Sequence, residues 1–488
     1  MARAKFYLGF LISTIAFSIS ASAAEVSPHL LGHLQSVEGP VDVMVYMNSK
    51  ADLSFSASLV QRPARLRFVH SQLVKEAKRS QGAILKRLEV LGFATRSFHI
   101  ENAVLVKEAS SELVNELAAR SDVRRVALDA KIPMKLPDNP STEGQIASTE
   151  PLRMVAAPRV WEELGVRGEG IVVAGQDTGV RWDHESLINQ YRGVEANGQL
   201  ASHDYNWHDA IHSSSGPCGS SSAVPCDDHS HGTHTIGTVV GDNGRGVVTG
   251  VAPDAKWIAC RNMDKGVGTV STYLECFEFF LSPFPVGGSA RENGDPSLAP
   301  HIVNNSWSCP RSEGCDGEEF VETIRSLNAA GILTVVSAGN DGPGCESVAN
   351  PPGMYSGLVI SVGAFNRYRR EIAFFSSRGP SAWNGELAPT VTAPGSNIRS
   401  AVHDSRSSYG DKSGTSMAGP HVAGVAALLW SAKPDLIGDI ETTMRVLSET
   451  SDPILKGKSC AGFPGRQHPN AVYGWGMVNA YRAITESD

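Results

Sequence analysis

The sequence predicts an α/β protein, in which a mostly parallel sheet lies between two layers of helices, preceded by a small α+β domain. Two observations indicate this fold class. After residue 155, apolar β-rich runs alternate with helical runs, and this alternation implies a three-layer α/β/α domain. Before it, residues 41–128 show a β-α-β-β-α-β succession, which is the split pattern of ferredoxin-like domains. At 488 residues the chain has room for both units.

The elements of the first unit follow in order. Residues 41–47 are β-prone, 64–91 carry apolar residues at helical spacing, and 93–100 and 102–107 are two further strand-like runs. Ser111 can cap a short helix through residue 120, and 123–128 closes the series. We expect one domain over residues 24–136. It either acts on the rest of the same chain or is an independent binding domain.

The second unit begins after a linker, 137–150, that is rich in proline, serine and glycine and therefore accessible. Its expected buried strands are 170–176, 256–260, 301–305, 332–336 and 358–362. The candidate helices between them are 232–240, 271–280, 318–330 and 416–431.

The first residues have the order of a secretory signal. Arg3 and Lys5 precede the apolar run 6–19, and small residues around Ala23 offer a cleavage site. A membrane anchor is the alternative, but the run is shorter than the roughly 20 residues that span a bilayer. We therefore expect residues 1–23 to be a signal peptide, with cleavage after Ala23 or Ala24, export, and no transmembrane segment.

The eight cysteines all lie beyond residue 200, and an even number in an exported chain predicts disulfides. No C-x-x-C pair is present, which argues against a zinc cluster. Short separations favour two local bridges, and two more follow by elimination: Cys218 with Cys226 and Cys309 with Cys315, then Cys260 with Cys276 and Cys345 with Cys460.

Charge divides the chain unevenly. Residues 25–140 carry 16 Lys and Arg against 13 Asp and Glu, a net of +3, whereas 141–488 carry 25 against 38, a net of −13. Opposite signs favour docking of the first segment on the second. Neither segment has the concentrated basic stripe that nucleic-acid binding requires, so we expect no nucleic-acid partner.

Three short motifs carry the chemistry, in the order acid, base, hydroxyl. They are Asp177-Thr178-Gly179, His231-Gly232-Thr233-His234 and the segment Gly414-Thr415-Ser416-Met417-Ala418-Gly419-Pro420-His421. These groups are what covalent acyl transfer by an activated serine needs. Asp177 follows a predicted strand, where open α/β sheets carry their sites, and Ser416 would begin a helix.

This order is the subtilisin one, and the complete motifs resemble those of the subtilisin-like serine proteases, the peptidase S8 or subtilase family. The resemblance implies a subtilisin-like catalytic domain over 151–488. It also implies an inhibitory propeptide of the inhibitor I9 type over 24–136, with self-cleavage in the linker 137–150. Cysteine-flanked insertions resemble those of the bacillopeptidase F group; these loops rim the expected cleft, and they tune specificity or only staple long loops.

The resemblance also assigns roles. Asp177 would orient the imidazole of His231, which relays the proton, while Ser416 attacks the peptide carbonyl. Asn340, after a predicted strand, and the backbone N–H of Ser416 would form the oxyanion hole. Substrate binding would use two segments, one pairing with an extended peptide and one walling the principal pocket: Ser306, Trp307 and Ser308 in the first, Ala338 and Gly339 in the second. A buried structural role for Trp307 is the alternative.

Two metal hypotheses arise from the sequence. His229, His231 and His234 lack the H-E-x-x-H spacing of zinc helices, so His234 is interpreted as a packing residue. Family members often bind calcium, and Asp242 and Asn243 follow the histidine helix with oxygen ligands that suit this cation. A plain turn is the alternative to this structural calcium site, and no cofactor is required for the chemistry.

The sequence thus predicts a secreted, self-processing serine endopeptidase that acts through an acyl-enzyme on Ser416. We expect a monomer whose partners are protein or peptide substrates and its own propeptide, which acts as intramolecular chaperone and inhibitor. Two alternatives remain: a catalytically silent family member used for binding, and a non-peptide acyl hydrolase. The G-x-S-x-G elbow of esterases fails at Ala418, which disfavours the latter.

Overall fold

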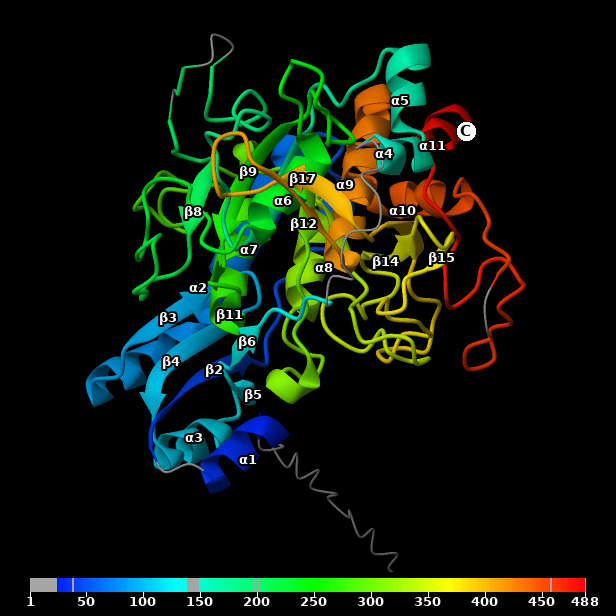
Figure 1. The fold of residues 1–488 in the computed structure, drawn as a ribbon. Helices are drawn as coiled ribbons and strands as arrows, with labels where there is room; N and C mark the ends of the chain where they lie inside the picture. The colour runs from blue at the N-terminus through cyan, green and yellow to red at the C-terminus, as the bar shows by residue number, and fades with distance from the viewer. Residues whose placement is uncertain are drawn as a thin grey trace, which may run out of the picture.

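A computed structural model describes residues 24–36, 39–137, 149–195, 199–200, 202–456 and 459–487. The predicted signal peptide, 1–23, and most of the predicted linker lie outside the described residues. Within the described ranges, no helix has the length and apolar character needed to cross a membrane. An N-terminal unit, up to residue 137, packs against a larger unit that begins at residue 149 (Figure 1).

The larger unit is built on an eight-stranded sheet in the order β15-β14-β13-β12-β7-β9-β8, with β16 also beside β14. All its pairings are parallel except that of β15 with β14. The strands are β7 (Val172–Asp177), β8 (Trp207–Asp209), β9 (Lys256–Arg261), β12 (Ile302–Asn305), β13 (Leu333–Ser337), β14 (Ile360–Asn366), β15 (Glu371–Ile372) and β16 (Val391–Pro394). The five predicted strands and their parallel arrangement are confirmed.

Helices cover both faces of this sheet. Alternate strand residues enter two different apolar clusters, because side chains alternate across a strand. Val173 and Ile302 pack with α6 (His231–Val240) and α9 (Thr415–Ala432), whereas Ala174 and Val303 pack with α7 (Val270–Leu281) and α8 (Val321–Ala330). Other elements of this unit are α4 (Glu150–Met154), α5 (Ala157–Arg159), β10 (Met263–Asp264), β11 (Val267–Thr269), β17 (Ile398–Ala401), β18 (Tyr409–Lys412), α10 (Ile440–Glu449) and α11 (Ala480–Thr485).

The N-terminal unit has the predicted element order, with a five-stranded sheet in the order β1-β5-β2-β4-β3. Three of its elements were not predicted: the short strand β1 beside β5, the helix α1 that follows it, and β6 after the predicted series. Ser110, one residue before the predicted Ser111, caps α3 by accepting from the N–H of Leu113 (3.3 Å). The elements are β1 (Glu25–Val26), α1 (Pro28–Ser36), β2 (Val41–Met47), α2 (Arg62–Leu91), β3 (Thr95–Phe98), β4 (Ala103–Ala109), α3 (Ser111–Ala118), β5 (Val123–Leu128) and β6 (Lys131–Pro133).

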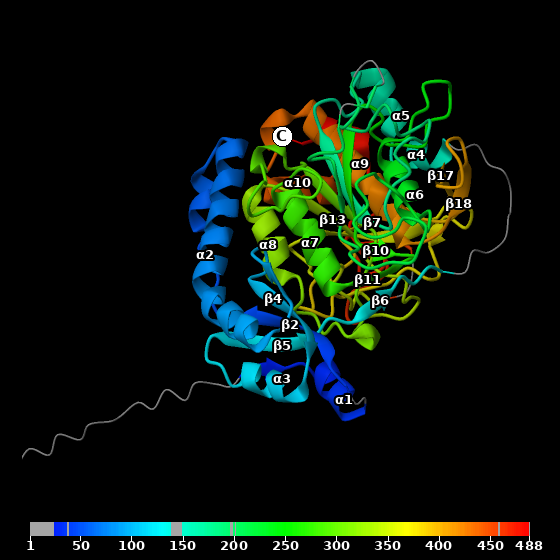
Figure 2. The same cartoon turned by 90° about the vertical axis from the view of Figure 1, so that its left-hand side faces the viewer.

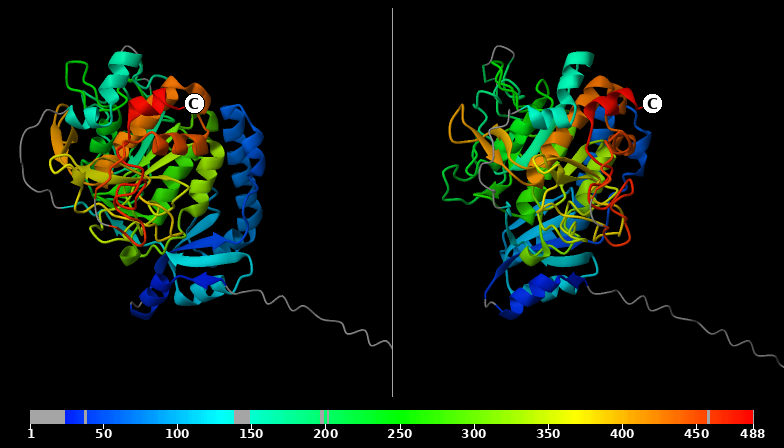
Figure 3. Two further views of the ribbon diagram at one scale, coloured as in Figure 1. Left: turned by 90° about the vertical axis from the view of Figure 1, so that its right-hand side faces the viewer. Right: turned by 45° about the vertical axis from the view of Figure 1, so that its right-hand side comes forward.

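The two units share one apolar core. Val43 and Val45 point into a core made by the N-terminal unit alone. Met44 and Tyr46, on the other face of β2, belong to the cluster that contains Phe277 of α7. The first half of α2 joins this shared cluster, and α2 runs beside α8 (Figures 2 and 3). The boundary between the units is therefore packed like an interior.

Carboxylates of the N-terminal unit cap two helices of the larger unit. Oε2 of Glu101 accepts from the N–H and hydroxyl of Thr323 in α8, both at 2.7 Å. Asp129 accepts in the same way from the N–H (2.9 Å) and hydroxyl (2.7 Å) of Ser271 in α7. The first N–H groups of a helix have no partner inside it, so the carboxyl oxygens that accept from them stabilise docking.

Cations of the N-terminal unit complete the boundary. Arg65 donates to the carbonyls of Asn328 (3.1 Å) and Ala329 (2.7 Å), at the other end of α8. Ion pairs also cross with the predicted sign, each from a cation of the N-terminal unit to a carboxylate of the larger one: Lys50–Glu322, Arg96–Glu275, Arg124–Glu318, Arg125–Asp316 and Arg125–Glu319.

All eight cysteines form disulfides, in the four predicted pairs. Cys260 with Cys276 joins β9 to α7, and Cys345 with Cys460 joins loops 115 residues apart in sequence. The other two bridges close short surface loops.

The buried Glu101 predicts a pH-dependent stability of the uncut chain. Burial raises its pKa to about 8, against about 4.3 for an exposed glutamate. Its stabilising effect is therefore complete below about pH 4.3 and is lost as the pH rises through 8. In the Ser416→Ala background, which we expect to stay uncut, Glu101→Gln should raise Tm relative to its parent progressively between pH 5 and pH 9. Differential scanning calorimetry checks this; a constant Tm difference would contradict it.

Candidate active site

Asp177 and His231 form a direct hydrogen-bonded pair. Asp177 ends β7, and His231 is the first residue of α6. Nδ1 of His231 lies 2.8 and 2.9 Å from the two carboxylate oxygens of Asp177. An ionised carboxylate can only accept, so Nδ1 carries the proton and Nε2 is left as the basic nitrogen. Both side chains are buried.

Asp227, which sequence reasoning missed, holds the start of α6. Ser230 precedes the helix with a φ of 74° and makes no side-chain cap. Asp227 Oδ1 instead accepts from the N–H groups of His229 (2.9 Å) and Ser230 (2.8 Å). Its Oδ2 accepts from the N–H (2.9 Å) and hydroxyl (2.6 Å) of Thr233. A carboxylate before a helix start is a recognised capping signal, and it fixes the direction in which His231 leaves the helix.

Thr178 and two glycines bring the acid and base motifs together. The hydroxyl of Thr178 donates to Asp227 Oδ1 (2.9 Å) and accepts from the N–H of Gly232 (3.0 Å). A Cβ at Gly232 would lie 2.1 Å from the carbonyl oxygen of Gly179, so a larger residue would push α6 away from β7. This close approach explains why small residues surround both catalytic candidates.

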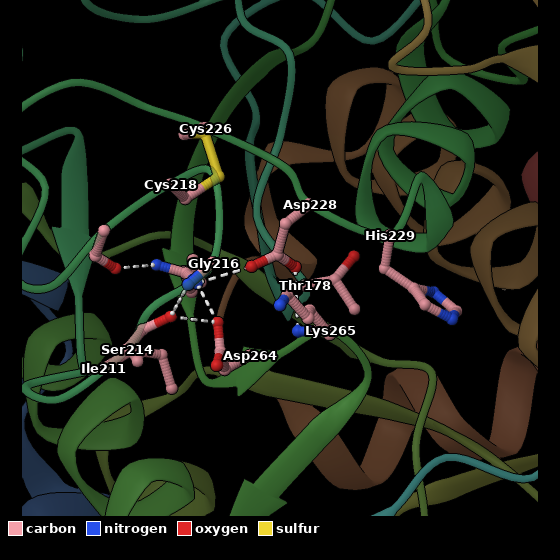
Figure 4. A network of polar contacts seen from close by, with 12 residues as sticks. Thr178, Ile211, Ser214, Gly216, Cys218, Cys226, Asp228, His229, Asp264 and Lys265 are labelled. Carbon is pink, nitrogen blue, oxygen red and sulfur yellow. Dashed lines mark hydrogen bonds and ion pairs between the residues drawn. A yellow bond between two sulfur atoms is a disulfide. The ribbon is translucent and has the colours of Figure 1, made fainter.

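A buried arginine anchors the loop that carries Asp227. Arg261 ends β9 directly beside Asp177 in the register of the sheet. Its guanidinium donates to Asp209 (3.1 Å), Asp228 (2.5 Å) and Asp264 (2.6 Å). Figure 4 shows Asp228 and Asp264 in this polar network, close to the Cys218–Cys226 disulfide. Burial raises the pKa of Asp209 and of Asp228, while the nearby guanidinium favours their ionised forms.

Ser416 lies beside Ser306, which directly follows β12, the strand next to β7. It is the second residue of α9, and its hydroxyl donates to the carbonyl of Ser306 (2.9 Å), whose own hydroxyl donates to the carbonyl of Ser416 (3.0 Å). Asn305 pairs with Gln176, so Ser306 is level with Asp177. The predicted contact from the Ser416 hydroxyl to His231 is not formed, because the hydroxyl is turned to Ser306. Nε2 of His231 is buried and has no hydrogen-bond partner among the described residues.

Asn340 is fixed beside Ser416 and faces a carbonyl of the N-terminal unit. Its Oδ1 accepts from the N–H (3.0 Å) and hydroxyl (2.9 Å) of Thr415, the first residue of α9. Its Nδ2 is thereby directed away from the helix and donates to the carbonyl of Lys135 (3.1 Å). Sequence reasoning missed Lys135, because only docking of the N-terminal unit brings it here.

A cleft surrounds these groups, and four of the five predicted substrate-binding residues line it. They are Ser306, Trp307, Ser308 and Gly339, which lie around the cleft together with Asn340, Ser416 and residues 133–135. Ala338 is the exception: it is buried in the shared core, and its N–H donates to Val362. Most of Trp307 is also buried, stacked on Tyr273 with ring centres 3.9 Å apart.

The metal candidates are engaged elsewhere. Nε2 of His234 lies 2.8 Å from the carbonyl of Ile398, and burial lowers its pKa to about 3, as expected for a packing residue. Asp242 is paired with Arg167 (2.9 Å), and Oδ1 of Asn243 accepts from two backbone N–H groups of its own loop. In this conformation these oxygens do not fit a calcium ion. The part of the chain that the structure describes holds no cluster of three metal-ligating His, Cys, Asp or Glu residues.

The fold and this arrangement belong to one class of protein. The subtilase family profile matches residues 168–476, and the chain belongs to that family. It is 35% identical over 439 residues to bacillopeptidase F of Bacillus subtilis, covering 86% of this chain and 28% of that protein. It is 30% identical over 340 residues to the serine protease AprX of the same organism, covering 65% of this chain and 66% of that protein. The chain therefore spans less than two thirds of the length of both relatives.

Removing the carboxylate of Asp227 should destabilise the fold. Asp227→Ala leaves the N–H groups at the start of α6 unsatisfied in a buried position, at a cost of about 3 kcal/mol. Urea unfolding of the Ser416→Ala chain measures this. Asp404→Ala, which removes an exposed carboxylate, is the control and should change the free energy of unfolding by less than about 0.5 kcal/mol. Equal effects of the two substitutions would contradict the capping role.

Proposed function

We propose that this chain is a secreted serine endopeptidase, made as a self-processing precursor, that hydrolyses peptide bonds through an acyl-enzyme on Ser416. One observation carries the proposal: the carbonyl of Lys135 accepts a hydrogen bond from Asn340 in a cleft that Ser416 lines. A peptide carbonyl thus meets the donor that would stabilise its oxyanion. The segment before it is extended and pairs with β11, which is how a peptide substrate adds to a strand.

In this mechanism Ser416 is the nucleophile and His231 the general base. The hydroxyl of Ser416 turns from Ser306 to Nε2 of His231 by rotation about its Cα–Cβ bond, and His231 takes its proton as Oγ attacks the carbonyl carbon. His231 then gives the proton to the leaving amine, and water hydrolyses the acyl-enzyme by the reverse route. Asp177 keeps the proton on Nδ1 and stabilises the imidazolium.

Two donors would stabilise the tetrahedral intermediate. Nδ2 of Asn340 is already aimed at a carbonyl oxygen, because Thr415 holds the other side of the amide. The N–H of Ser416 belongs to the first turn of α9, where N–H groups have no partner inside the helix. Preorganised donors of this kind need no rearrangement as charge develops.

The N-terminal unit would act as inhibitor and intramolecular chaperone. Residues 133–135 line the cleft beside Asn340 and Ser416, and they would block substrates while the unit is docked. Its side chains also cap α7 and α8 and complete a core that the larger unit would otherwise expose. These contacts favour an assignment of residues 24–136 as propeptide and of 151–488 as the enzyme.

Secretion is proposed from the signal-like residues 1–23 and is supported by four disulfides, which persist in oxidising compartments. We propose a monomer that acts on protein or peptide substrates without a cofactor. Binding of a structural calcium ion at Asp242 and Asn243 would require displacement of Arg167 and of backbone donors.

Ser416→Ala should abolish turnover and leave the precursor uncut. In subtilisin itself the loss of this serine lowers kcat by about 10⁶-fold, and we expect a similar effect here. Casein hydrolysis and fluorophosphonate labelling check the loss of the nucleophile, and the mass of the purified chain checks that the precursor stays uncut. Labelling without casein hydrolysis would instead favour a non-peptide acyl hydrolase, and no labelling of the wild-type chain would favour a silent family member.

Asn340→Ala should lower kcat by roughly 10²–10³-fold, the range known for the corresponding donor in subtilisin, with a small change in KM. The reason is that the lost Nδ2 bond is strongest in the transition state. Steady-state kinetics on a peptide substrate measure it. Asn384→Ala, at an exposed asparagine away from the cleft, is the control. A rise in KM with an unchanged kcat would argue against the oxyanion role.

A further inference from the structure

The occupant of the cleft shows which peptide bond faces the catalytic groups. Ile132 pairs with Gly268 of β11, and the N–H of Met134 donates to the carbonyl of Gly266 (2.8 Å). The chain therefore reaches Lys135 as an extended strand. Because Asn340 donates to the carbonyl of Lys135, the bond exposed to attack is the one between Lys135 and Leu136. This bond lies one residue before the end of the predicted propeptide, 24–136, and not in the linker 137–150 where the sequence predicts self-cleavage.

The side chain of Lys135 meets a carboxylate on an inserted loop. Nζ of Lys135 lies 3.7 Å from Oε1 of Glu313, whose side chain is only 12% exposed. Oε2 of Glu313 is buried and has no hydrogen-bond partner among the described residues. A desolvated carboxylate that is only partly paired favours a cation beside it and disfavours an apolar neighbour.

A short, disulfide-closed loop presents Glu313. The Cys309–Cys315 disulfide closes the loop, and a short 3-10 turn, Arg311–Glu313, fills it. A Cβ at Gly314 would lie 2.6 Å from Cβ of Ala130, so the loop packs directly on the chain that leads into the cleft. In this position Glu313 can contact the side chain of a peptide residue bound in the cleft.

A second carboxylate adds negative charge near Glu313. Asp341 directly follows Asn340 and also lines the cleft. Burial raises the pKa of Glu313, and the Asp341 carboxylate raises it further, while the ammonium of Lys135 lowers it. Two carboxylates near the ammonium of Lys135 give this side of the cleft negative charge, which an uncharged side chain in place of Lys135 would not compensate.

We propose that Glu313, held by the disulfide-closed loop, makes this enzyme select Lys or Arg immediately before the scissile bond, and that maturation cuts between Lys135 and Leu136. The proposal rests on the endopeptidase function proposed above. In the maturation step Oγ of Ser416 bonds to the carbonyl carbon of Lys135, and the bond from that carbon to the nitrogen of Leu136 breaks. The serine proton passes through His231 to that nitrogen, and water then releases Lys135 as a carboxylic acid.

Peptide kinetics test the selectivity. Substrates that differ only in the residue before the scissile bond, with Lys, Arg, Gln, Leu or Glu there, are compared by kcat/KM. The wild-type enzyme should prefer Lys and Arg, and Glu313→Gln should reduce the Lys-to-Gln ratio about tenfold without lowering kcat/KM for the Gln substrate. Glu318→Gln, which removes a half-exposed carboxylate paired with Arg124, is the matched control and should leave the ratio unchanged.

The maturation site gives an independent readout. The processed wild-type enzyme should begin at Leu136 by N-terminal sequencing, Lys135→Gln should slow processing, and Lys135→Arg should preserve it. A wild-type preference for uncharged residues, an unchanged ratio in Glu313→Gln, or a first cut elsewhere would overturn the proposal while leaving the endopeptidase function intact. Absence of all turnover and of fluorophosphonate labelling would overturn the function itself, and this proposal with it.

Discussion

The register between β7 and β12 is the constraint on which the site depends. Gln176 lies opposite Asn305 and donates to its side-chain oxygen (2.5 Å), and its own oxygen accepts from Asn262, just past β9 (3.1 Å). This row of buried amides ties together the carboxyl ends of three neighbouring strands. A slip of one residue would unpair them and turn alternate side chains to the wrong face. Since Asp177 ends β7 and Ser306 directly follows β12, the row sets the level of the carboxylate that holds His231 and of the carbonyl that holds the Ser416 hydroxyl.

Beyond the carboxyl ends of these strands, hydrogen bonds between polar groups hold the site, in place of apolar packing. Asp227 and Thr178 hold the first turn of α6, and Thr415 holds Asn340. Each uses backbone N–H groups that the start of a helix leaves without a partner. The catalytic candidates thus sit where two helices begin, and the hydrogen bonds from the N–H groups of those helix starts to Asp227, Thr178 and Asn340 also orient the imidazole and the amide. A site of this kind needs few additional residues, because the helix ends supply most of its hydrogen bonds.

Much of the fold could be predicted from the sequence, because the signals were local. Helical spacing in α2 and buried β-rich runs such as β9 and β13 gave elements within a few residues of their bounds. The direction of the Ser416 hydroxyl could not be predicted, because a rotating hydroxyl follows the nearest acceptor, here the carbonyl of Ser306. Ala338 was expected in the pocket wall, but neighbouring residues of an extended segment alternate, and its side chain enters the core.

Two further residues needed the tertiary structure. Ser230 precedes α6 and fits the usual capping pattern, yet its positive φ turns it away and Asp227 caps instead. Asp227 can take this capping role because Arg261 anchors the loop that carries it. No local sequence pattern reveals this anchor. Lys135 carries no motif at all, and it reaches the cleft only because the whole N-terminal unit docks.

The docking contacts also determine whether a cut after Lys135 would release the N-terminal unit from the larger unit. The shared apolar core, the capping of α8 by Glu101 and the boundary ion pairs lie away from the cut bond, so hydrolysis removes none of them. The new carboxylate at Lys135 would still accept from Asn340, and its ammonium would still face Glu313. The contacts that we propose to select the bond would therefore also retain the product. Freeing the cleft must come from unfolding or digestion of the N-terminal unit, whose separate core consists of only a small cluster around Val43 and Val45.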